Sequence, residues 1–200
     1  MQGRLSAKLP ALLQSFPYAN WEDEFSRARR LGFSSIEWLY DKHFDEDNPL
    51  MSLAGREKIK RLMAANSISV DSVCAHAFID GSLGQFGEHT LTSFGKLIET
   101  CAEMRIRRVV LPLIEGSSMR HLEDWKRFIA RLRPQIEYLQ ENGLELLLES
   151  DWPQAKLVSM LSEAQFPAIS LCYDVGNRVA DGFDPCQEFS EIAGFVGEVH

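Results

Sequence analysis

Residues 144–151, with the sequence LELLLESD, decide the fold class. The stretch is rich in leucine and reaches Glu149, so an apolar run passes directly into a carboxylate. A strand that is buried on both faces reads as a nearly continuous apolar run, which is the pattern of parallel sheets. This stretch is therefore predicted to be a strand of a parallel sheet with an acidic side chain at its carboxyl end.

Similar runs recur roughly every 30 residues along the chain. The stretches between them have the spacing of amphipathic helices, for example Trp21 to Leu31 and Leu122 to Leu139. Gly32 and Gly143 stand where these two helices should end. Strand-then-helix repetition builds right-handed βαβ units and a parallel sheet. The predicted strands are residues 35–39, 69–75, 108–113, 144–149, 168–174 and 195–200.

Two α/β architectures fit this alternation, an open doubly wound sheet and a closed barrel. A nucleotide-binding doubly wound sheet usually carries a glycine-rich turn after its first strand, and the sequence holds no GxGxxG or Walker-type loop. Polar residues instead follow nearly every predicted strand, as in a barrel, whose strand ends all surround one axis. The sequence therefore favours a TIM (β/α)8-type barrel. These strand-end residues are Glu37, His76, Glu115, Glu149, Asp174 and His200.

Composition predicts a single globular domain spanning residues 1–200. Hydrophobic residues make up 45% of the chain and charged residues 25%, which is enough to bury one core without suggesting disorder. The net charge of −8 disfavours binding to a nucleic acid through bulk electrostatics. No apolar run approaches the roughly 18 residues that a membrane span needs, and the first residues hold no signal peptide.

The four cysteines are widely spaced and form no CxxC pair. In a chain of this length they are predicted to be reduced and mostly buried thiols, which indicates a cytoplasmic protein. The four are Cys74, Cys101, Cys172 and Cys186.

Three successive predicted strands end in Glu149, Asp174 and His200. Each residue has a structural alternative, since Glu149 could cap the following helix and a strand-end histidine is often only hydrogen-bonded. Asp151, which directly precedes Trp152, suits that helix cap better. Together the three offer two carboxylates and one imidazole around a common axis, which is a ligand set for Mn²⁺, Mg²⁺, Co²⁺ or Zn²⁺. Mixed oxygen and nitrogen ligation favours Mn²⁺ or Co²⁺.

Several motifs resemble the sugar phosphate isomerase/epimerase-like proteins of the xylose isomerase-like TIM-barrel superfamily. That superfamily includes ketose 3-epimerases, hydroxypyruvate isomerases, inosose dehydratases and endonuclease IV. The resemblance covers essentially the whole chain. The motifs are residues 2–6 (QGRLS), 14–17 (QSFP), 20–25 (NWEDEF), 31–33 (LGF), 36–38 (IEW) and 48–50 (NPL).

The resemblance implies a metal held by Glu, Asp, His and a second Glu from strands five to eight of the barrel. Glu149, Asp174 and His200 take the first three places, and the fourth has no counterpart in this chain. The sequence reaches only the seventh strand, and residues 1–4 fall where the first strand should be finishing. We therefore expect an incomplete barrel in which strand 8 is missing and strand 1 is clipped.

The mechanism implied by the resemblance is proton transfer in a sugar or sugar phosphate through a cis-enediolate. A divalent ion, with Mn²⁺ favoured, would act as a Lewis acid. Glu149 would be the catalytic base, and His76 and Asn177 would face the substrate. Glu37 and Glu115 are expected to have structural hydrogen-bonding roles at the barrel mouth.

Two alternatives stay open. A catalytically impaired or truncated barrel could bind a sugar or a partner chain, and a homo-oligomer could cover its open edges. An endonuclease IV-like DNA repair enzyme is disfavoured, because that chemistry needs several histidines around a metal cluster. Asn177 and Glu115 stand where two of those histidines would be expected.

Overall fold

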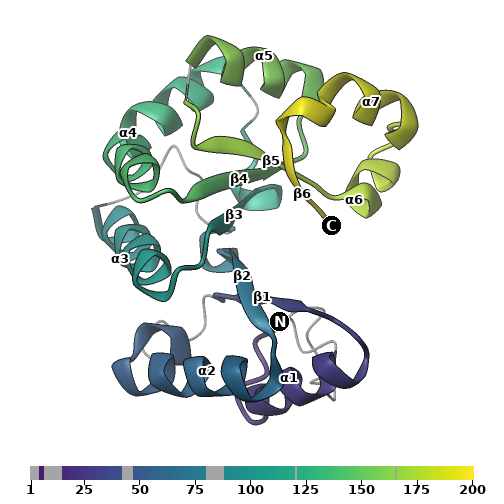
Figure 1. Cartoon of the computed structure of the whole chain (residues 1–200). Helices are drawn as coiled ribbons and strands as arrows, with labels where there is room; N and C mark the ends of the chain where they lie inside the picture. The colour runs from purple at the N-terminus through teal and green to yellow at the C-terminus, as the bar shows by residue number, and fades with distance from the viewer. Residues whose placement is uncertain (1–4, 7–14, 42–46, 80–87, 120, 165) are drawn as a thin grey trace.

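The computed structural model describes residues 5–6, 15–41, 47–79, 88–119, 121–164 and 166–200 (Figure 1). The expected clipped first strand, at residues 1–4, lies outside these ranges. Among the described helices, none is both long enough and apolar enough to cross a bilayer.

Six parallel strands form one sheet in which each strand pairs with the next along the chain. The sheet curls so that its strands follow an arc, and within the described residues β1 and β6 are its two edges (Figure 1). This is the arrangement of an incomplete TIM barrel and confirms the predicted fold class. The strands are β1 (Ser35–Leu39), β2 (Ser69–Cys74), β3 (Arg108–Leu113), β4 (Glu145–Ser150), β5 (Ile169–Tyr173) and β6 (Val196–Val199).

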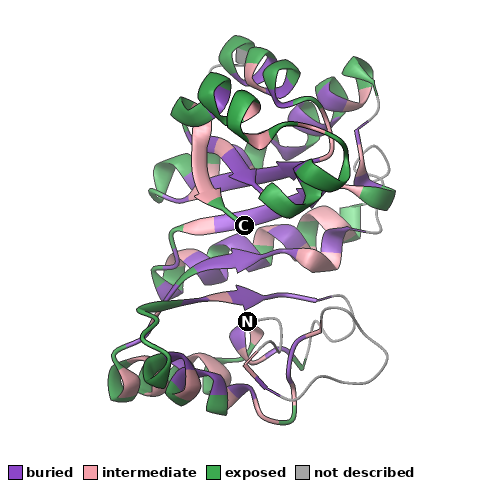
Figure 2. Cartoon of the chain, turned by 90° about the vertical axis from the view of Figure 1, so that its right-hand side faces the viewer, coloured by how far each residue is buried: buried purple, intermediate pink, exposed green. Residues whose placement is uncertain are grey.

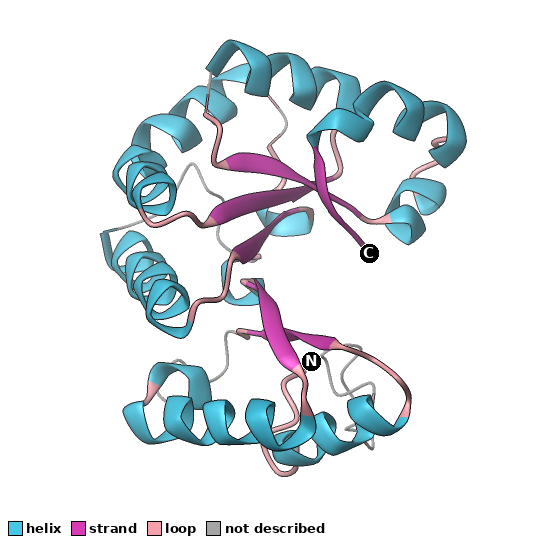
Figure 3. Cartoon of the chain, viewed as in Figure 1, coloured by secondary structure: helices cyan, strands magenta, loops and turns pink. Residues whose placement is uncertain are grey.

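Helices lie on the convex side of this sheet, and the concave side faces the barrel axis (Figure 3). The chain's last residue, His200, lies on the concave side (Figure 1). Short 3₁₀ turns join the longer elements in the described part of the chain: η1 (Pro49–Met51), η2 (His76–Phe78), η4 (Glu115–Ser117) and η5 (Ala193–Phe195). The helices are α1 (Trp21–Arg30), α2 (Leu53–Asn66), α3 (Glu88–Met104), α4 (Leu122–Glu141), α5 (Gln154–Ala164), α6 (Val175–Ala180) and α7 (Pro185–Ile192).

The predicted strands are found in place, with small differences at their ends. β1 and β3 have the predicted bounds, whereas β4 is shifted by one residue to Glu145–Ser150. The last strand is shorter than expected, because Phe195 belongs to the 3₁₀ turn that enters it and His200 lies beyond its final residue. Both predicted helix-ending glycines have positive φ angles, 83° at Gly32 and 67° at Gly143, a conformation that glycine adopts without steric cost.

The main hydrophobic core lies between the sheet and its helices. Most of the length of the central strands is buried, as the purple ribbon in Figure 2 shows. A separate small cluster of three buried side chains, Val110, Leu147 and Cys172, lies on the opposite face. Because side chains alternate along a strand, the neighbours Leu171 and Tyr173 point instead into the main core. The three-residue cluster therefore marks the face that lines the barrel axis.

Two buried polar residues fasten the segments that carry the resemblance motifs. The indole of Trp38 donates a 2.9 Å hydrogen bond to Asn48 Oδ1, and the amide of Asn48 donates to the backbone of β1. Asp41 accepts a hydrogen bond from the backbone N–H of Phe16 at 2.9 Å and another from the hydroxyl of Tyr18 at 2.6 Å. These motif segments hold the loops around β1 in place.

Candidate active site

A cavity of about 1000 Å³ opens on the concave side of the sheet. It has the size of a small-molecule site. Its lining includes every strand-end residue that the sequence singled out, and these lie in, or directly after, all six strands of the sheet. The predicted residues in its lining are Glu37, His76, Glu115, Glu149, Asp174, Asn177 and His200.

Glu149 is the most buried carboxylate of this set, with 8% of its surface exposed. It faces the barrel axis because it lies two residues beyond Leu147, on the same face of β4. The side-chain amide of Asn177 donates a 2.9 Å hydrogen bond to Glu149 Oε1. Asp151, expected to cap the next helix, accepts a hydrogen bond from the hydroxyl of Ser118.

The environment of Glu149 favours its protonated form. Burial raises its pKa from an ordinary value of 4.5 to about 7. The positive charge of His200 opposes this rise, whereas the negative charges of Asp174 and Glu37 add to it. The hydrogen bond from Asn177 also opposes it. A carboxylate of this kind can accept or release a proton near neutral pH.

His200 is surrounded by acceptors. Its Nε2 lies 3.3 Å from Glu37 Oε2 and 3.9 Å from Glu198 Oε1. Hydrogen bonds with Cys172, Glu198 and Glu37 raise the pKa of the imidazole well above its ordinary value of 6.5. These contacts favour the protonated ring, so binding a metal through it would release a proton.

Asp174 lines the cavity but already has a structural partner. Its Oδ1 accepts a 2.8 Å hydrogen bond from the backbone N–H of Asn177, so this carboxylate caps α6. The sequence did not reveal this role, because the cap depends on a helix that begins directly after β5. Asp174 lies close enough to Glu149 for its charge to raise the pKa of that residue.

Within the described residues, two groups of side chains have the proximity that a metal site needs. The ligand atoms of Glu149, Cys172 and His200 all lie within 4.8 Å of one another, and so do those of Glu37, Glu198 and His200. The predicted pair Glu149 and His200 is thus brought together, but Asp174 belongs to neither group. A carboxylate, a thiol and an imidazole are a donor set that fits a divalent ion.

Cys172 and Glu198 are the residues of this site that sequence reasoning missed. Cys172 stands two positions before Asp174, and Glu198 stands two positions before His200. The two-residue period of a strand was the available signal, because it places each one on the same face as its partner. Cys172 is 1% exposed, and burial raises the pKa of its thiol to about 11 against the opposing effect of hydrogen bonding with His200.

The remaining predicted residues differ in how they are held. His76 begins the turn η2 directly after β2. Glu115 follows β3 with a φ angle of 52°, a strained conformation for a side chain of this kind. Glu37 accepts a 3.4 Å hydrogen bond from Ser72 in addition to its contact with His200. Strain at the mouth of a cavity is typical of functional positions.

An ion pair between the buried Arg178 and the mostly buried Glu188 joins the two helices that follow β5. Arg178 donates to Glu188 Oε2 at 2.9 Å through Nε and to Glu188 Oε1 at 2.7 Å through Nη2. The hydroxyl of Tyr173 and the backbone N–H of Gln154 also donate to Glu188. The guanidinium stacks on Phe183 with 3.8 Å to the ring centre. These contacts tie α6 and α7 to the carboxyl end of β5.

The family model described as xylose isomerase-like TIM barrel matches residues 25–200. This chain therefore belongs to that family, as its sequence motifs indicated. No curated protein sequence matches the chain.

Solved structures share the fold at low sequence identity. D-psicose 3-epimerase, determined in the presence of D-fructose, superposes with a TM-score of 0.72 at 14% identity, over 90% of this chain and 67% of that one. The 3-keto-D-glucoside 4-epimerase of E. coli gives 0.69 at 18% identity, over 90% and 72%. A xylose isomerase-like TIM barrel protein from Mycobacterium smegmatis, in complex with magnesium, gives 0.70 at 19% identity, over 92% and 66%.

The chain spans about two thirds to three quarters of the length of these three proteins. At such identities the likeness establishes the fold. The sugar substrates and the magnesium belong to those proteins.

Proposed function

We propose that this member of the xylose isomerase-like TIM barrel family is a divalent-metal-dependent isomerase or epimerase of a sugar or sugar phosphate. One observation carries the proposal: the buried carboxylate of Glu149 lies within 4.8 Å of His200 in the lining of a cavity of about 1000 Å³, and its burial there raises its pKa to about 7. A base that removes a proton from carbon works best when its pKa is near the working pH. The sugar epimerases that share the fold support the same reaction class.

The proposed ligands are Glu149, Asp174 and His200, which end three neighbouring parallel strands. A bound divalent ion would supply Lewis acidity, which polarises a carbonyl and favours loss of a proton from the adjacent carbon. Asp174 has an oxygen other than the Oδ1 that caps α6 to offer in this role. Mixed oxygen and nitrogen ligation makes Mn²⁺ the expected ion for these three ligands.

The residues of the chain divide the remaining work. Glu149 accepts the proton from the carbon beside the carbonyl, and the electron pair of that C–H bond moves into the cis-enediolate of the substrate. Return of a proton to the neighbouring carbon, or to the other face of the same carbon, completes isomerisation or epimerisation. Asn177 orients the base through its 2.9 Å hydrogen bond, and His76 offers a polar group to substrate hydroxyls.

The test is exchange of solvent deuterium into a panel of ketoses and ketose phosphates by the purified protein. Exchange should require a divalent ion, supplied as Mn²⁺ or Co²⁺, and should stop when the ion is chelated. Glu149→Gln should lower the exchange rate by about 10²- to 10⁴-fold, the usual contribution of a general base.

Glu145→Gln is the matched control, because Glu145 lies on the same face of the same strand at its opposite end. That variant should exchange at close to the wild-type rate. If a sugar binds but no deuterium enters it under any condition, the chain is a sugar-binding barrel and not an enzyme. Metal-dependent exchange that survives in Glu149→Gln would contradict the role of Glu149.

A further inference from the structure

Three donor groups of different chemistry converge on the axial face of the sheet. A carboxylate oxygen of Glu149, the thiol sulfur of Cys172 and an imidazole nitrogen of His200 all lie within 4.8 Å of one another. They come from β4, from β5 and from the residue that follows β6. Thiol sulfur is a soft ligand, so a site that contains it prefers softer ions than a site made of oxygen ligands does.

The position of Cys172 follows from the register of the strands. In β5, Leu171 and Tyr173 pack into the main core, and Cys172 packs with Val110 and Leu147 on the axial face. Its partner across the ladder is Glu198 in β6. The thiol is therefore held in place by strands, the most rigid part of the fold, rather than by a loop.

Asp174 is less free to serve than Cys172. The Asp174 side chain caps α6 through a 2.8 Å hydrogen bond from the backbone N–H of Asn177. Cys172 lies on the same face two residues earlier, and its sulfur lies within 4.8 Å of the ligand atoms of Glu149 and His200, a spacing at which one ion could contact all three. Of Asp174 and Cys172, only Cys172 therefore lies close enough to both Glu149 and His200 to form a three-residue group with them.

We propose that Cys172 is a sulfur ligand of a divalent ion that it shares with Glu149 and His200 at the wall of the cavity, and that the site therefore selects Zn²⁺ or Co²⁺ over Mg²⁺ and Mn²⁺. Binding forms a bond between the metal and the thiolate, and the thiol proton is released to solvent. Thiolate and imidazole ligands suit Zn²⁺ and Co²⁺, whereas Mg²⁺ and Mn²⁺ prefer sites of oxygen. The proposal deepens the proposed function at the same site, but its test does not depend on catalytic activity.

The first measurement is the absorption spectrum of the chelator-treated, reduced protein titrated with Co²⁺. A thiolate bound to Co²⁺ gives a near-ultraviolet charge-transfer band, so the wild type should develop this band with one ion bound per chain. Cys172→Ser should lose the band. The matched controls Cys101→Ser, in α3, and Cys186→Ser, in α7, should keep it.

The second measurement is equilibrium dialysis against Zn²⁺ and against Mn²⁺. Loss of a direct ligand should weaken Zn²⁺ binding in Cys172→Ser by at least the 10- to 100-fold that loss of a supporting residue costs, about 1.4 to 2.7 kcal/mol. Mn²⁺ binding should change only a few-fold. Cys172→Asp, which restores an oxygen donor, should shift the preference towards Mn²⁺, and it serves as a second variant if Cys172→Ser does not fold.

The outcomes separate this proposal from the proposed function. Co²⁺ bound without a charge-transfer band, or a band that survives in Cys172→Ser, overturns the role of Cys172. Wild-type protein that binds neither Co²⁺ nor Zn²⁺ overturns it as well. Metal-dependent deuterium exchange without the band would leave the proposed function standing alone. The band without exchange into any sugar would leave only the thiolate site.

Discussion

Glu149 is buried and Glu188 is mostly buried, and both carboxylates lie near the carboxyl end of the same sheet, yet they have opposite surroundings. Glu188 accepts hydrogen bonds from Nε and Nη2 of Arg178, from the hydroxyl of Tyr173 and from the backbone N–H of Gln154. Glu149 accepts one side-chain hydrogen bond among the described contacts, from Asn177, and lies near other carboxylates.

The pKa values follow these surroundings. Burial alone would raise the pKa of Glu188, but the hydrogen bonds from Arg178 and from the backbone of Gln154 hold it below 4.5. Burial raises that of Glu149 to about 7. A carboxylate with all its acceptor positions used is part of the scaffold. One that is left short of donors in a cavity is available for chemistry.

The largest expected effect is a loss of stability when Glu188 loses its partner Arg178. Arg178→Met removes the charge but keeps most of the aliphatic packing, and it leaves Glu188 without its main partner. We expect the free energy of unfolding to fall by about 3 to 5 kcal/mol, as when one partner of a buried pair is lost. Urea unfolding followed by circular dichroism measures this loss. A loss below about 1 kcal/mol would mean that the pair does not hold α6 and α7.

The pH dependence of stability should have opposite signs at the two residues. Folding raises the pKa of Glu149, so its contribution to stability is full below about pH 4.5 and declines as the pH rises through about 7. In metal-free protein, the free energy of unfolding of the wild type relative to Glu149→Gln should therefore fall by about 2 to 3 kcal/mol between pH 5 and pH 8.

Glu188→Gln provides the opposing control for that measurement. Folding lowers the pKa of Glu188, so its contribution is present above pH 4.5 and is lost as the pH falls below that value. The stability difference between the wild type and Glu188→Gln should thus shrink in acid and stay constant from pH 6 to pH 8. If the stability difference from the wild type changed with pH in the same direction for Glu149→Gln and Glu188→Gln, the two carboxylates would not have opposite pKa shifts.

A smaller effect is expected at Asn177. Its side-chain amide is the donor to Glu149, and that hydrogen bond lowers the pKa of the carboxylate. Asn177→Ala should raise this pKa further by less than about one pH unit, equivalent to about 1 kcal/mol. The midpoint of the titration, followed by carboxyl NMR with Glu149→Gln as the assignment control, measures the change. A downward shift would contradict the donor role.

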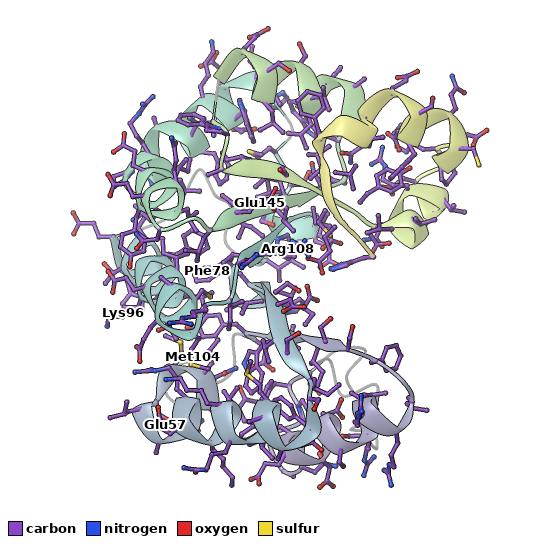
Figure 4. All side chains as sticks on the ribbon, viewed as in Figure 1. Glu57, Phe78, Lys96, Met104, Arg108 and Glu145 are labelled. Carbon is purple, nitrogen blue, oxygen red and sulfur yellow. The ribbon has the colours of Figure 1, made fainter. Side chains whose placement is uncertain are left out.

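The smallest effect on stability is expected for the ion pair between Arg108 and Glu145. Glu145 begins β4 and lies on the same face of that strand as Glu149. Arg108 Nε lies 3.9 Å from Glu145 Oε2, and both side chains are over one third exposed (Figure 4). A pair of this kind stabilises by less than about 1 kcal/mol and weakens with added salt. A double-mutant cycle of Arg108→Gln and Glu145→Gln, measured by urea unfolding at low and high salt, should find this coupling. A coupling of several kcal/mol would contradict this expectation, because it would mean that the exposed pair contributes strongly to the stability of the fold.

The sequence by itself determined where the strands and helices lie. Apolar runs such as residues 144–149 and stripes such as that of α4 report burial locally, residue by residue, so the alternation and the parallel sheet could be predicted. It also identified which polar residues follow the strands. The ends of β4 and β6 were less well predicted, because a strand ends where its neighbour stops pairing with it.

Only the tertiary structure decided which of those polar residues meet, and in what state. Whether Asp174 caps a helix, whether Cys172 joins Glu149 and His200, and whether Arg178 satisfies Glu188 all depend on the register between strands and the placement of the helices that follow. Periodicity along one segment carries no such information. The pKa of Glu149 depends likewise on groups brought from other strands, which no local pattern can place.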